Sequence, residues 1–321
     1  MMLDIIVTHY NEPYEVGRKF FEILAHQRGV NFNMFRVILV NDGEENRLPD
    51  EHFKDLPYKV RQINIKHQGV SAARNAGLAL SNAKWVMWCD FDDTFTSIFS
   101  LRQIMSVLNT DDYDLLYAPF FIEYRVGNDI FVKLQGRNNV WVHGRVYRRE
   151  WLNQQNLRFK EGLHYSEDSA FNCLCNELVD YRREGEIKSD FPIYLWSFRR
   201  ESVTSDPANE ERNLYGFIDR NTYVVEEIRR RGKNQIPFVA RMFADAYYAF
   251  HQKKKFPAVE RHFKGIAIQY LEEYKQNDIK TIKTVMDAAK KAFNAKDLDT
   301  HESIDEWLMR ITKKKVTKNG D

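Results

Sequence analysis

Apolar and polar positions follow two alternating periods over the first 125 residues of the chain. Short runs rich in β-branched residues predict strands at residues 3–8, 35–40, 58–65 and 84–89. Helical spacing predicts a helix that ends at Gly29, an Ala-rich helix over residues 71–83 with Ser71 as its N-cap, and a helix over residues 96–108. Strands that alternate with helices indicate crossover connections, and therefore an α/β fold with a mostly parallel sheet and helices on both faces.

The pattern changes beyond residue 114. Residues 115–125 and 129–135 predict a hairpin, residues 166–168 begin a helix, and residues 191–198 predict a strand. From about residue 209 the chain is helical in pattern and richly charged, without a strand candidate. We therefore expect two domains, an α/β domain over residues 1–208 and an all-helical C-terminal extension over residues 209–321.

Polar side chains follow each of the first four predicted strands. They are Thr8, Tyr10 and Glu12 after the first strand, Asp42 after the second, Arg74 in the helix after the third, and Asp90, Asp92 and Asp93 after the fourth. Ligands of open parallel sheets bind beyond the carboxyl ends of the strands. The sequence therefore predicts that these side chains form one site.

Composition and motif spacing exclude several classes of protein. Forty-eight Lys and Arg residues against 46 Asp and Glu residues give a net charge of +2, so no global field draws the chain to nucleic acid. The glycines form neither G-x-G-x-x-G nor a Walker A loop, and the histidines never form H-x-x-x-H. Three cysteines are too few for a disulfide framework. With no signal-peptide or membrane-span pattern, we expect a cytoplasmic protein.

The acidic residues after the fourth strand suit a divalent cation. Asp90 and Asp92 form an Asp-x-Asp pair, and Mg²⁺ or Mn²⁺ takes few protein carboxylates while phosphate oxygens and water complete its shell. A turn that caps the following helix is the alternative. Arg74 could grip a phosphate near a helix N-terminus, or lie on the surface. Asp42 could accept the imide N–H of a pyrimidine base, or simply form a turn.

An ordered set of motifs resembles the family 2 glycosyltransferases of the GT-A fold. The motifs are VTHYNEP, VNDG, GVSAARNAGL, CDFDD and YSEDSAF, followed by residues 140–152, 157–163 and 194–205. The resemblance covers roughly residues 2–205. It implies an inverting, metal-dependent transferase that moves a sugar from a nucleotide donor, UDP-hexose or UDP-N-acetylhexosamine, to a hydroxyl of a glycan or surface-polymer acceptor.

The resemblance also implies roles for residues on the donor side. Thr8, Tyr10 and Glu12 would border the nucleoside, and Asp42 would contact the base. Arg74 would face the diphosphate. The second strand departs from the family pattern, since it ends Asn-Asp where two acids are usual. A closing loop over the donor phosphates would contain Arg199, Ser202 and Thr204.

The metal and the general base are implied in the same way. Asp90 would contact the ribose or the metal, and Asp92 would be the main ligand of Mn²⁺ or Mg²⁺. Asp168, beside Glu167, would be the general base. Two adjacent carboxylates raise the pKa of one of them, which makes a better base, and neighbours on a helix point about 100° apart, so only one faces the donor.

Residues outside these motifs have weaker predicted roles. Trp141 and His143 could contact an acceptor sugar, although a core position suits the Trp equally. The clusters Lys253–Lys255 and Lys313–Lys315, with Arg310 and Lys318, could place the C-terminal helices against an anionic membrane or polymer, peripheral at the inner face of the membrane. The alternative is a solvated face of a helical bundle that supports a homo-oligomer.

Three other functions remain open from the sequence. Transfer to a modified nucleic-acid base, as in some virus-encoded enzymes, is disfavoured by the near-neutral charge. A non-catalytic nucleotide-sugar-binding protein would not need both Asp92 and Asp168. A nucleotidyltransferase of similar fold would need a Gly-rich first loop, which is absent.

Overall fold

The computed structural model describes residues 1–163, 165–189, 191–199, 209–252, 256–295, 298 and 301–313. These residues form two compact units, one with the strands and helices up to residue 199 and one with the helices from residue 210 onward. Ser202, Thr204, Lys253–Lys255 and Lys318 lie outside the described residues. The predicted domain boundary at residues 208/209 also borders such a segment and stays a prediction.

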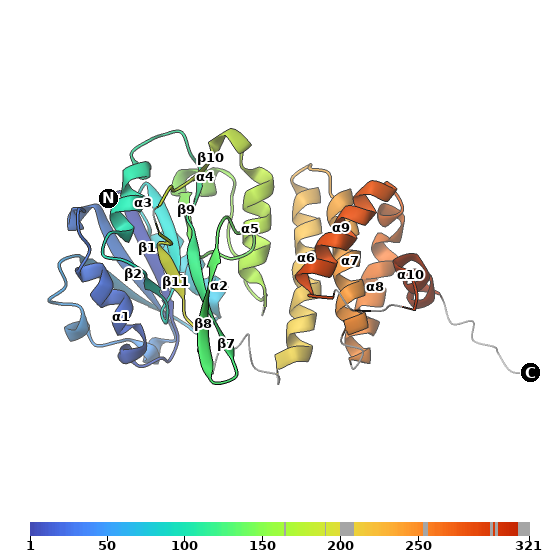
Figure 1. Cartoon of the computed structure of the whole chain (residues 1–321), viewed down its shortest axis with the longest axis horizontal. Helices are drawn as coiled ribbons and strands as arrows, with labels where there is room; N and C mark the ends of the chain where they lie inside the picture. The colour runs from blue at the N-terminus through green and yellow to red at the C-terminus, as the bar shows by residue number, and fades with distance from the viewer. Residues whose placement is uncertain are drawn as a thin grey trace, which may run out of the picture. The chain divides into compact units, whose positions relative to one another are not determined.

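The first unit contains a seven-stranded sheet in the order β10-β6-β9-β4-β1-β2-β3 (Figure 1). Its strands are β1 (Leu3–His9), β2 (Phe35–Asp42), β3 (Lys59–Ile65), β4 (Trp85–Asp90), β6 (Leu115–Tyr117), β9 (Arg145–Arg148) and β10 (Glu184–Glu186). Only β9 runs antiparallel to its neighbours, β4 and β6. The predicted mostly parallel sheet is therefore confirmed.

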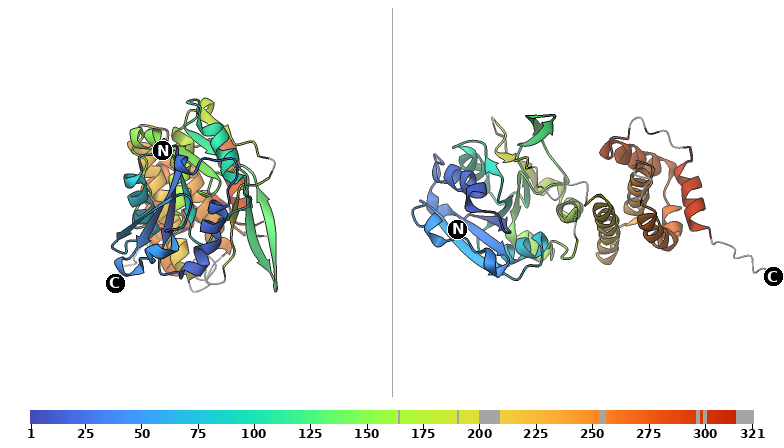
Figure 2. Two further views of the ribbon diagram at one scale, coloured as in Figure 1. Left: turned by 90° about the vertical axis from the view of Figure 1, so that its left-hand side faces the viewer. Right: turned by 90° about the horizontal axis from the view of Figure 1, so that it is seen from below.

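Helices cover both faces of this sheet (Figures 1 and 2). The helices are α1 (Tyr14–Ala25), α2 (Val70–Leu80), α3 (Ser100–Leu108), α4 (Arg149–Gln154) and α5 (Glu167–Leu178). Alternate residues of β1 point to opposite faces: Ile5 belongs to the core beneath α1 and α3, whereas Ile6 lies close to Gly77 of α2. A sheet buried on both sides explains why its central strands are almost continuously apolar.

Two predicted helix starts are wrong, for identifiable reasons. Helix α2 begins after Gly69, whose φ is +91°, and Ser71 lies inside the first turn with its hydroxyl buried and unpaired rather than capping. Helix α3 begins at Ser100 because the segment before it extends a second sheet, in which the Thr96 N–H donates to the Ile193 carbonyl at 3.2 Å. Helix α1 likewise ends at Ala25, before Gly29.

The second sheet has four strands in the order β5-β11-β7-β8. Its strands are β5 (Thr94–Phe95), β7 (Phe120–Val126), β8 (Asp129–Gln135) and β11 (Tyr194–Trp196). The predicted hairpin is β7–β8, joined through Gly127 and Asn128. The segment 115–119 does not belong to it, because Pro119 interrupts the strand and separates β6 from β7.

One glycine holds the turn that leads into β9. Gly144 has φ +68°, and a Cβ there would lie 2.4 Å from the carbonyl oxygen of Ala118. We expect Gly144→Ala to lower the free energy of unfolding by about 1–3 kcal/mol or more, because it forces strain on a clamped backbone. Urea denaturation measures this. Gly136→Ala, which has open space around it, should change stability by less than about 0.5 kcal/mol. Equal losses would contradict the assignment.

The second unit is helical throughout its described residues, as predicted. Its helices are α6 (Glu210–Arg230), α7 (Ile236–Gln252), α8 (Pro257–Tyr274), α9 (Ile279–Ala292) and α10 (Ile304–Thr312). Phe243, Phe263 and Trp307 are fully buried in its core. None of the described helices is both long enough and apolar enough to span a bilayer.

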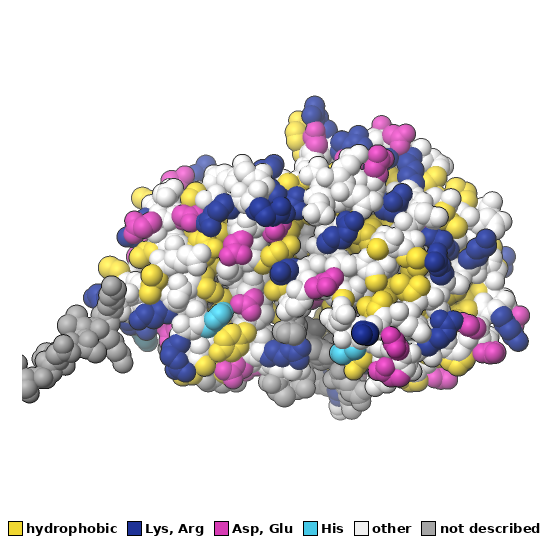
Figure 3. Space-filling model, turned by 180° about the vertical axis from the view of Figure 1, so that it is seen from behind, with side chains coloured by type: hydrophobic (Ala, Val, Ile, Leu, Met, Phe, Trp, Pro, Cys, Tyr) yellow, Lys and Arg dark blue, Asp and Glu magenta, His cyan; other side chains and the backbone are white. Residues whose placement is uncertain are grey.

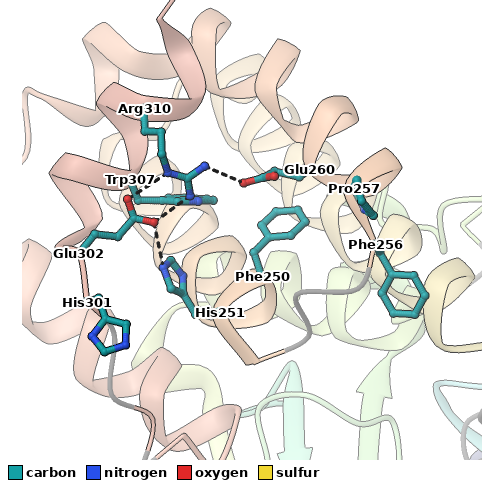
Figure 4. A pocket seen from close by; sticks show the side chains of 9 residues that line it. All are labelled: Phe250, His251, Phe256, Pro257, Glu260, His301, Glu302, Trp307 and Arg310. Atoms are coloured by element: carbon teal, nitrogen blue, oxygen red, sulfur yellow. Dashed lines mark hydrogen bonds and ion pairs between the residues drawn. The ribbon is translucent and has the colours of Figure 1, made fainter.

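This helical unit contains a cavity of about 500 Å³ among α7, α8 and α10 (Figure 4). Its polar side chains pair with one another. Glu302 contacts the imidazole of His251 at 3.3 Å and the guanidinium of Arg310 at 2.8 Å, and Arg310 also lies 3.6 Å from Glu260. These contacts connect α7 and α8 with α10 and with Glu302 just before it, and they engage Arg310, which the sequence had offered as part of a basic surface.

Candidate active site

The strand register places the predicted site residues at one edge of the large sheet. Thr8 of β1 lies opposite Asp90 of β4, and His9 lies opposite Asn41 of β2. The parallel strands β1, β2 and β4 therefore end side by side. The polar segments that follow them meet there, as the sequence predicted.

The segment after β1 forms a compact loop. The backbone N–H of Tyr10 donates to Glu12 Oε2 at 2.9 Å, and Asn11 takes a left-handed conformation with φ 60°. Tyr10 is 47% exposed and stacks on His67 at a centroid distance of 4.3 Å. This stacked pair offers a partly exposed aromatic face beside the strand ends.

Asp42 is buried and organises the turn before α2. Its carboxylate accepts the backbone N–H groups of Gln68 at 2.8 Å and Gly69 at 2.9 Å, and lies 3.0 Å from His67 Nδ1. Neighbouring Asn41 donates its amide to Asn64 Oδ1 at 2.9 Å. A carboxylate at position 41 could not donate, which explains why this strand ends Asn-Asp. The contact of Asp42 with a base stays a prediction.

Arg74 is buried between two carboxylates. Its guanidinium donates to Glu167 Oε1 at 2.8 Å and to Asp90 Oδ1 at 3.1 Å. Although burial opposes the charge, these two acids raise the pKa of Arg74 above its ordinary value. Burial also opposes the charge of Asp90, but Arg74 holds the pKa of that carboxyl below its ordinary value. Arg74 therefore joins the end of β4 to the start of α5, at the predicted phosphate side of the site.

Asp168 lies next to Glu167 but in a different electrostatic setting. Within the described part of the chain it has no ion-pair partner, and its Oδ1 accepts the N–H of Ser169 at 2.6 Å. Burial and the adjacent charge of Glu167 raise the pKa of Asp168 to about 7. One carboxylate of the pair is thus tied to a cation, and the other is available to exchange a proton near neutral pH.

Asp92 and Arg199 close the opposite side of the site. Arg199 Nε lies 3.4 Å from Asp92 Oδ2, and Arg199 Nη2 lies 3.3 Å from Glu12 Oε1. Burial and the charge of Asp90 raise the pKa of Asp92. Arg199 therefore bridges the ends of β1 and β4, consistent with its predicted place in a loop beside the donor.

A second acidic group lies beneath this surface. Asp93 is fully buried and accepts the hydroxyl of Tyr194 at 2.7 Å and the N–H of Ser197 at 2.8 Å. Burial, with the charges of Asp90 and Asp92, raises its pKa well above the ordinary value. Burial lowers the pKa of His143 to about 4, so this imidazole is neutral.

Ligand atoms of Asp90, Asp93 and His143 all lie within 4.8 Å of one another. His143 Nδ1 is buried 3.6 Å from Asp93 and has no hydrogen-bond partner in the described part of the chain. Two carboxylate oxygens and an imidazole nitrogen are suitable donors for Mn²⁺. The structure thus groups Asp90 with Asp93 and His143, whereas Asp92, the ligand predicted from sequence, faces Arg199.

The two predicted acceptor residues lie inside the fold rather than on an open surface. Trp141 is partly buried, packs against the core and meets Phe120 edge-on at 6.1 Å. His143 is only 6% exposed. Sequence reasoning assigned Tyr194 no role, although it begins the motif at residues 194–205; in the structure its hydroxyl donates to Asp93.

A sequence model described as Glycosyl transferase family 2 matches residues 4–180, more than half of the chain. The chain is 24% identical over 230 residues to the uncharacterized glycosyltransferase EpsJ of Bacillus subtilis (strain 168), which is 64% of each protein. It is 25% identical over 244 residues to the minor teichoic acid biosynthesis protein GgaA of the same strain, which is 70% of this chain and 53% of GgaA. The matches thus span less than two thirds of these relatives.

The fold resembles that of solved structures. The crystal structure of S. aureus TarS 1–349 in complex with UDP-GlcNAc superposes with a TM-score of 0.59 and 17% identity, over 91% of this chain and 92% of that chain. A likeness at this identity concerns the fold alone. It confirms the GT-A-like architecture, with C-terminal helices, that the sequence predicted.

Proposed function

The chain belongs to glycosyl transferase family 2, and we propose that it transfers a sugar from a nucleoside-diphosphate donor to an acceptor hydroxyl by one inverting displacement. The observation that supports this most is the contrast between two adjacent acids. Glu167 is hydrogen-bonded to Arg74, whereas Asp168 has no ion-pair partner among the described residues and has a pKa of about 7. A carboxyl group whose pKa is raised toward neutral pH is typical of acid–base catalysis.

Asp168 is the proposed general base. Its carboxylate takes the proton of the acceptor hydroxyl while that oxygen attacks the anomeric carbon and the bond to the diphosphate breaks. A single attack from the opposite side inverts the anomeric centre. Arg74 keeps Glu167 oriented away from this task and places positive charge where the leaving group gains negative charge.

The donor is proposed to lie over the ends of β1, β2 and β4. Tyr10 and His67 offer a stacking face for the nucleoside, with Thr8, Glu12 and Asp42 around it. Arg199, at the mouth of the site, could exchange its carboxylate partners for phosphate oxygens. A UDP-sugar is the proposed donor, supported by the similarity in fold to a protein solved with UDP-GlcNAc.

A divalent cation, Mn²⁺ or Mg²⁺, fits the oxygen-rich donor set at the end of β4. Asp90 and Asp92 would hold it, and Asp93 and His143 form a second donor group beside Asp90. Such an ion supplies charge neutralisation to a departing diphosphate. The partly exposed carboxylate of Asp92 supports the first set, and the buried Nδ1 of His143, which has no hydrogen-bond partner among the described residues, supports the second.

The acceptor is proposed to be a glycan or surface polymer, which the similarity to a teichoic acid biosynthesis protein supports. Binding to a polyanion or a membrane has less support. On the face seen in Figure 3, acidic and basic side chains are interspersed, and most of the predicted lysine clusters lie outside the described residues. We keep cytoplasmic placement, with peripheral membrane contact, as a proposal.

A screen of nucleotide sugars tests the proposal. The full chain is incubated with UDP-, GDP- and dTDP-sugars, with Mn²⁺, Mg²⁺ or a chelator, and release of nucleoside diphosphate is measured. We expect slow, metal-dependent hydrolysis of one UDP-sugar without acceptor. Binding of a nucleotide sugar without any turnover, even with glycan acceptors present, would favour a non-catalytic binding protein.

Turnover should depend on pH through Asp168. Its pKa of about 7 is raised from 3.8, so the base form is lost as the pH falls through 7. Single-turnover rates at saturating donor should fall about tenfold for each pH unit well below 7 and level off above about pH 8. A flat profile between pH 5.5 and 8 would exclude this group as the base.

A further inference from the structure

Strand β8 is an unprotected edge of the second sheet. It is the outermost strand, and Asp129 to Leu134 are all exposed. Three apolar residues on one face, Ile130, Val132 and Leu134, are each 56–58% exposed. Figures 1 and 2 show the β7–β8 hairpin extending away from the sheets of its unit.

Edge strands of monomeric proteins are normally protected. Short length, bulges, prolines or inward-pointing charges prevent the free N–H and C=O groups from pairing with another chain. Strand β8 is seven residues long and pairs with β7 without a bulge, from Gln135 opposite Phe120 to Asp129 opposite Val126. Its only basic residue is Lys133. A strand of this kind is expected to have a partner.

We propose that this partner is the β8 strand of a second copy, paired antiparallel about a two-fold axis at Phe131. This register places Asp129 opposite the partner's Lys133, and Ile130 opposite the partner's Val132. Each acid therefore faces a lysine of the partner, and each apolar residue faces an apolar residue. The surface is thus complementary to itself, as an isologous interface requires. Neither Asp129 nor Lys133 has an ion-pair partner within the described part of its own chain.

The side-chain chemistry selects this register. Opposed residues of an antiparallel pair share a face, so the two Phe131 rings meet between the two ion pairs, and Tyr124 already stacks on Phe131 at 5.9 Å. A shift of two residues either way places Asp129 opposite Gln135 or Phe131, and both charged residues lose their partners. Apolar contacts and ion pairs thus form together only when Phe131 lies on the two-fold axis.

The pairing would join two four-stranded sheets into one continuous sheet of eight. In the middle of β7, Glu123 accepts the N–H of Phe198 at 2.9 Å, beside Arg199. The interface is thus built on the same strands that support the loop near the donor. Because two single strands bury less than a standard interface of about 1,600 Å², we expect a weak dimer, with Kd in the micromolar range.

Sedimentation of the full chain between about 1 and 200 µM tests the dimer. Val132→Lys should abolish it. Lys133→Asp should raise Kd about tenfold, because it places an acid opposite Asp129 at both symmetry-related positions of the interface. The double exchange Asp129→Lys with Lys133→Asp should restore Kd to near the wild-type value. Lys54→Asp, an equal charge change on the exposed surface of the same unit, is the matched control and should leave Kd unchanged.

Circular dichroism and nucleotide-sugar hydrolysis by each variant establish that it is folded. A monomer at every concentration overturns the proposal, as does a dimer that persists in Val132→Lys. A double exchange that fails to recover the loss in Lys133→Asp overturns the register. Binding of the wild-type monomer, but not of Val132→Lys, to phosphatidylglycerol vesicles would instead assign the hairpin to a membrane and overturn the dimer.

Discussion

Replacing Asp168 with Asn is expected to lower turnover by about 10²–10⁴-fold while leaving donor affinity nearly unchanged. The amide keeps the shape of the side chain and its hydrogen bond with Ser169, but it cannot take a proton. Rapid-quench measurement of product formation gives turnover, and titration with the nucleoside diphosphate gives affinity. The rate of Asp168→Asn should also lose the pH dependence near 7.

Glu167→Gln is the matched control. It makes the same change one residue away, and Glu167 is held by Arg74 rather than free. Its turnover should fall less than that of Asp168→Asn. If Asp168→Asn instead lost donor binding while bound substrate reacted normally, Asp168 would be a binding or capping group, and Glu167 would become the first candidate for the base.

Replacing Asp92 with Ala is expected to abolish transfer and to uncouple diphosphate binding from Mn²⁺. As the proposed chief metal ligand, Asp92 should make UDP affinity rise with added Mn²⁺, because the cation bridges carboxylate and phosphate. Calorimetric titration of UDP with and without Mn²⁺ measures this coupling. Asp112→Ala, which removes an exposed acid elsewhere in the unit, should keep both activity and coupling.

Asp93→Asn separates the two donor groups seen in the structure. If Asp92 is the ligand, this variant should keep its Mn²⁺-dependent UDP binding, because Asp93 is occupied by Tyr194 and Ser197. Full activity in a chelator, or in Asp92→Ala, would remove the Asp-x-Asp assignment. Coupling that disappears in Asp93→Asn but not in Asp92→Ala would assign the metal to Asp90, Asp93 and His143.

The sequence predicted the sheet because its strands are long and regular. The four runs at residues 3–8, 35–40, 58–65 and 84–89 became β1 to β4. The buried strands β1, β2 and β4 are apolar on both faces, whereas β3, at the end of the sheet, mixes apolar and polar residues. Strands β9 and β10 were missed, because three or four residues are too few for a period to emerge. The start of α3 was misplaced because pairing of β5 with β11, which is nearly 100 residues away, outweighed the local helical pattern.

The same division holds at the site. Sequence alone determined which side chains lie at the carboxyl edge, because parallel strands in register bring the segments after them together. Only the tertiary structure decided which of these side chains pair with one another and which carboxyl groups have a raised pKa. Arg74 pairs with Glu167, Asp168 has no ion-pair partner among the described residues, and Tyr194 engages Asp93. These contacts join residues 93 and 101 positions apart, so no local pattern in the sequence predicts them. Burial then sets the pKa of each acid, and burial depends on packing that no local period encodes.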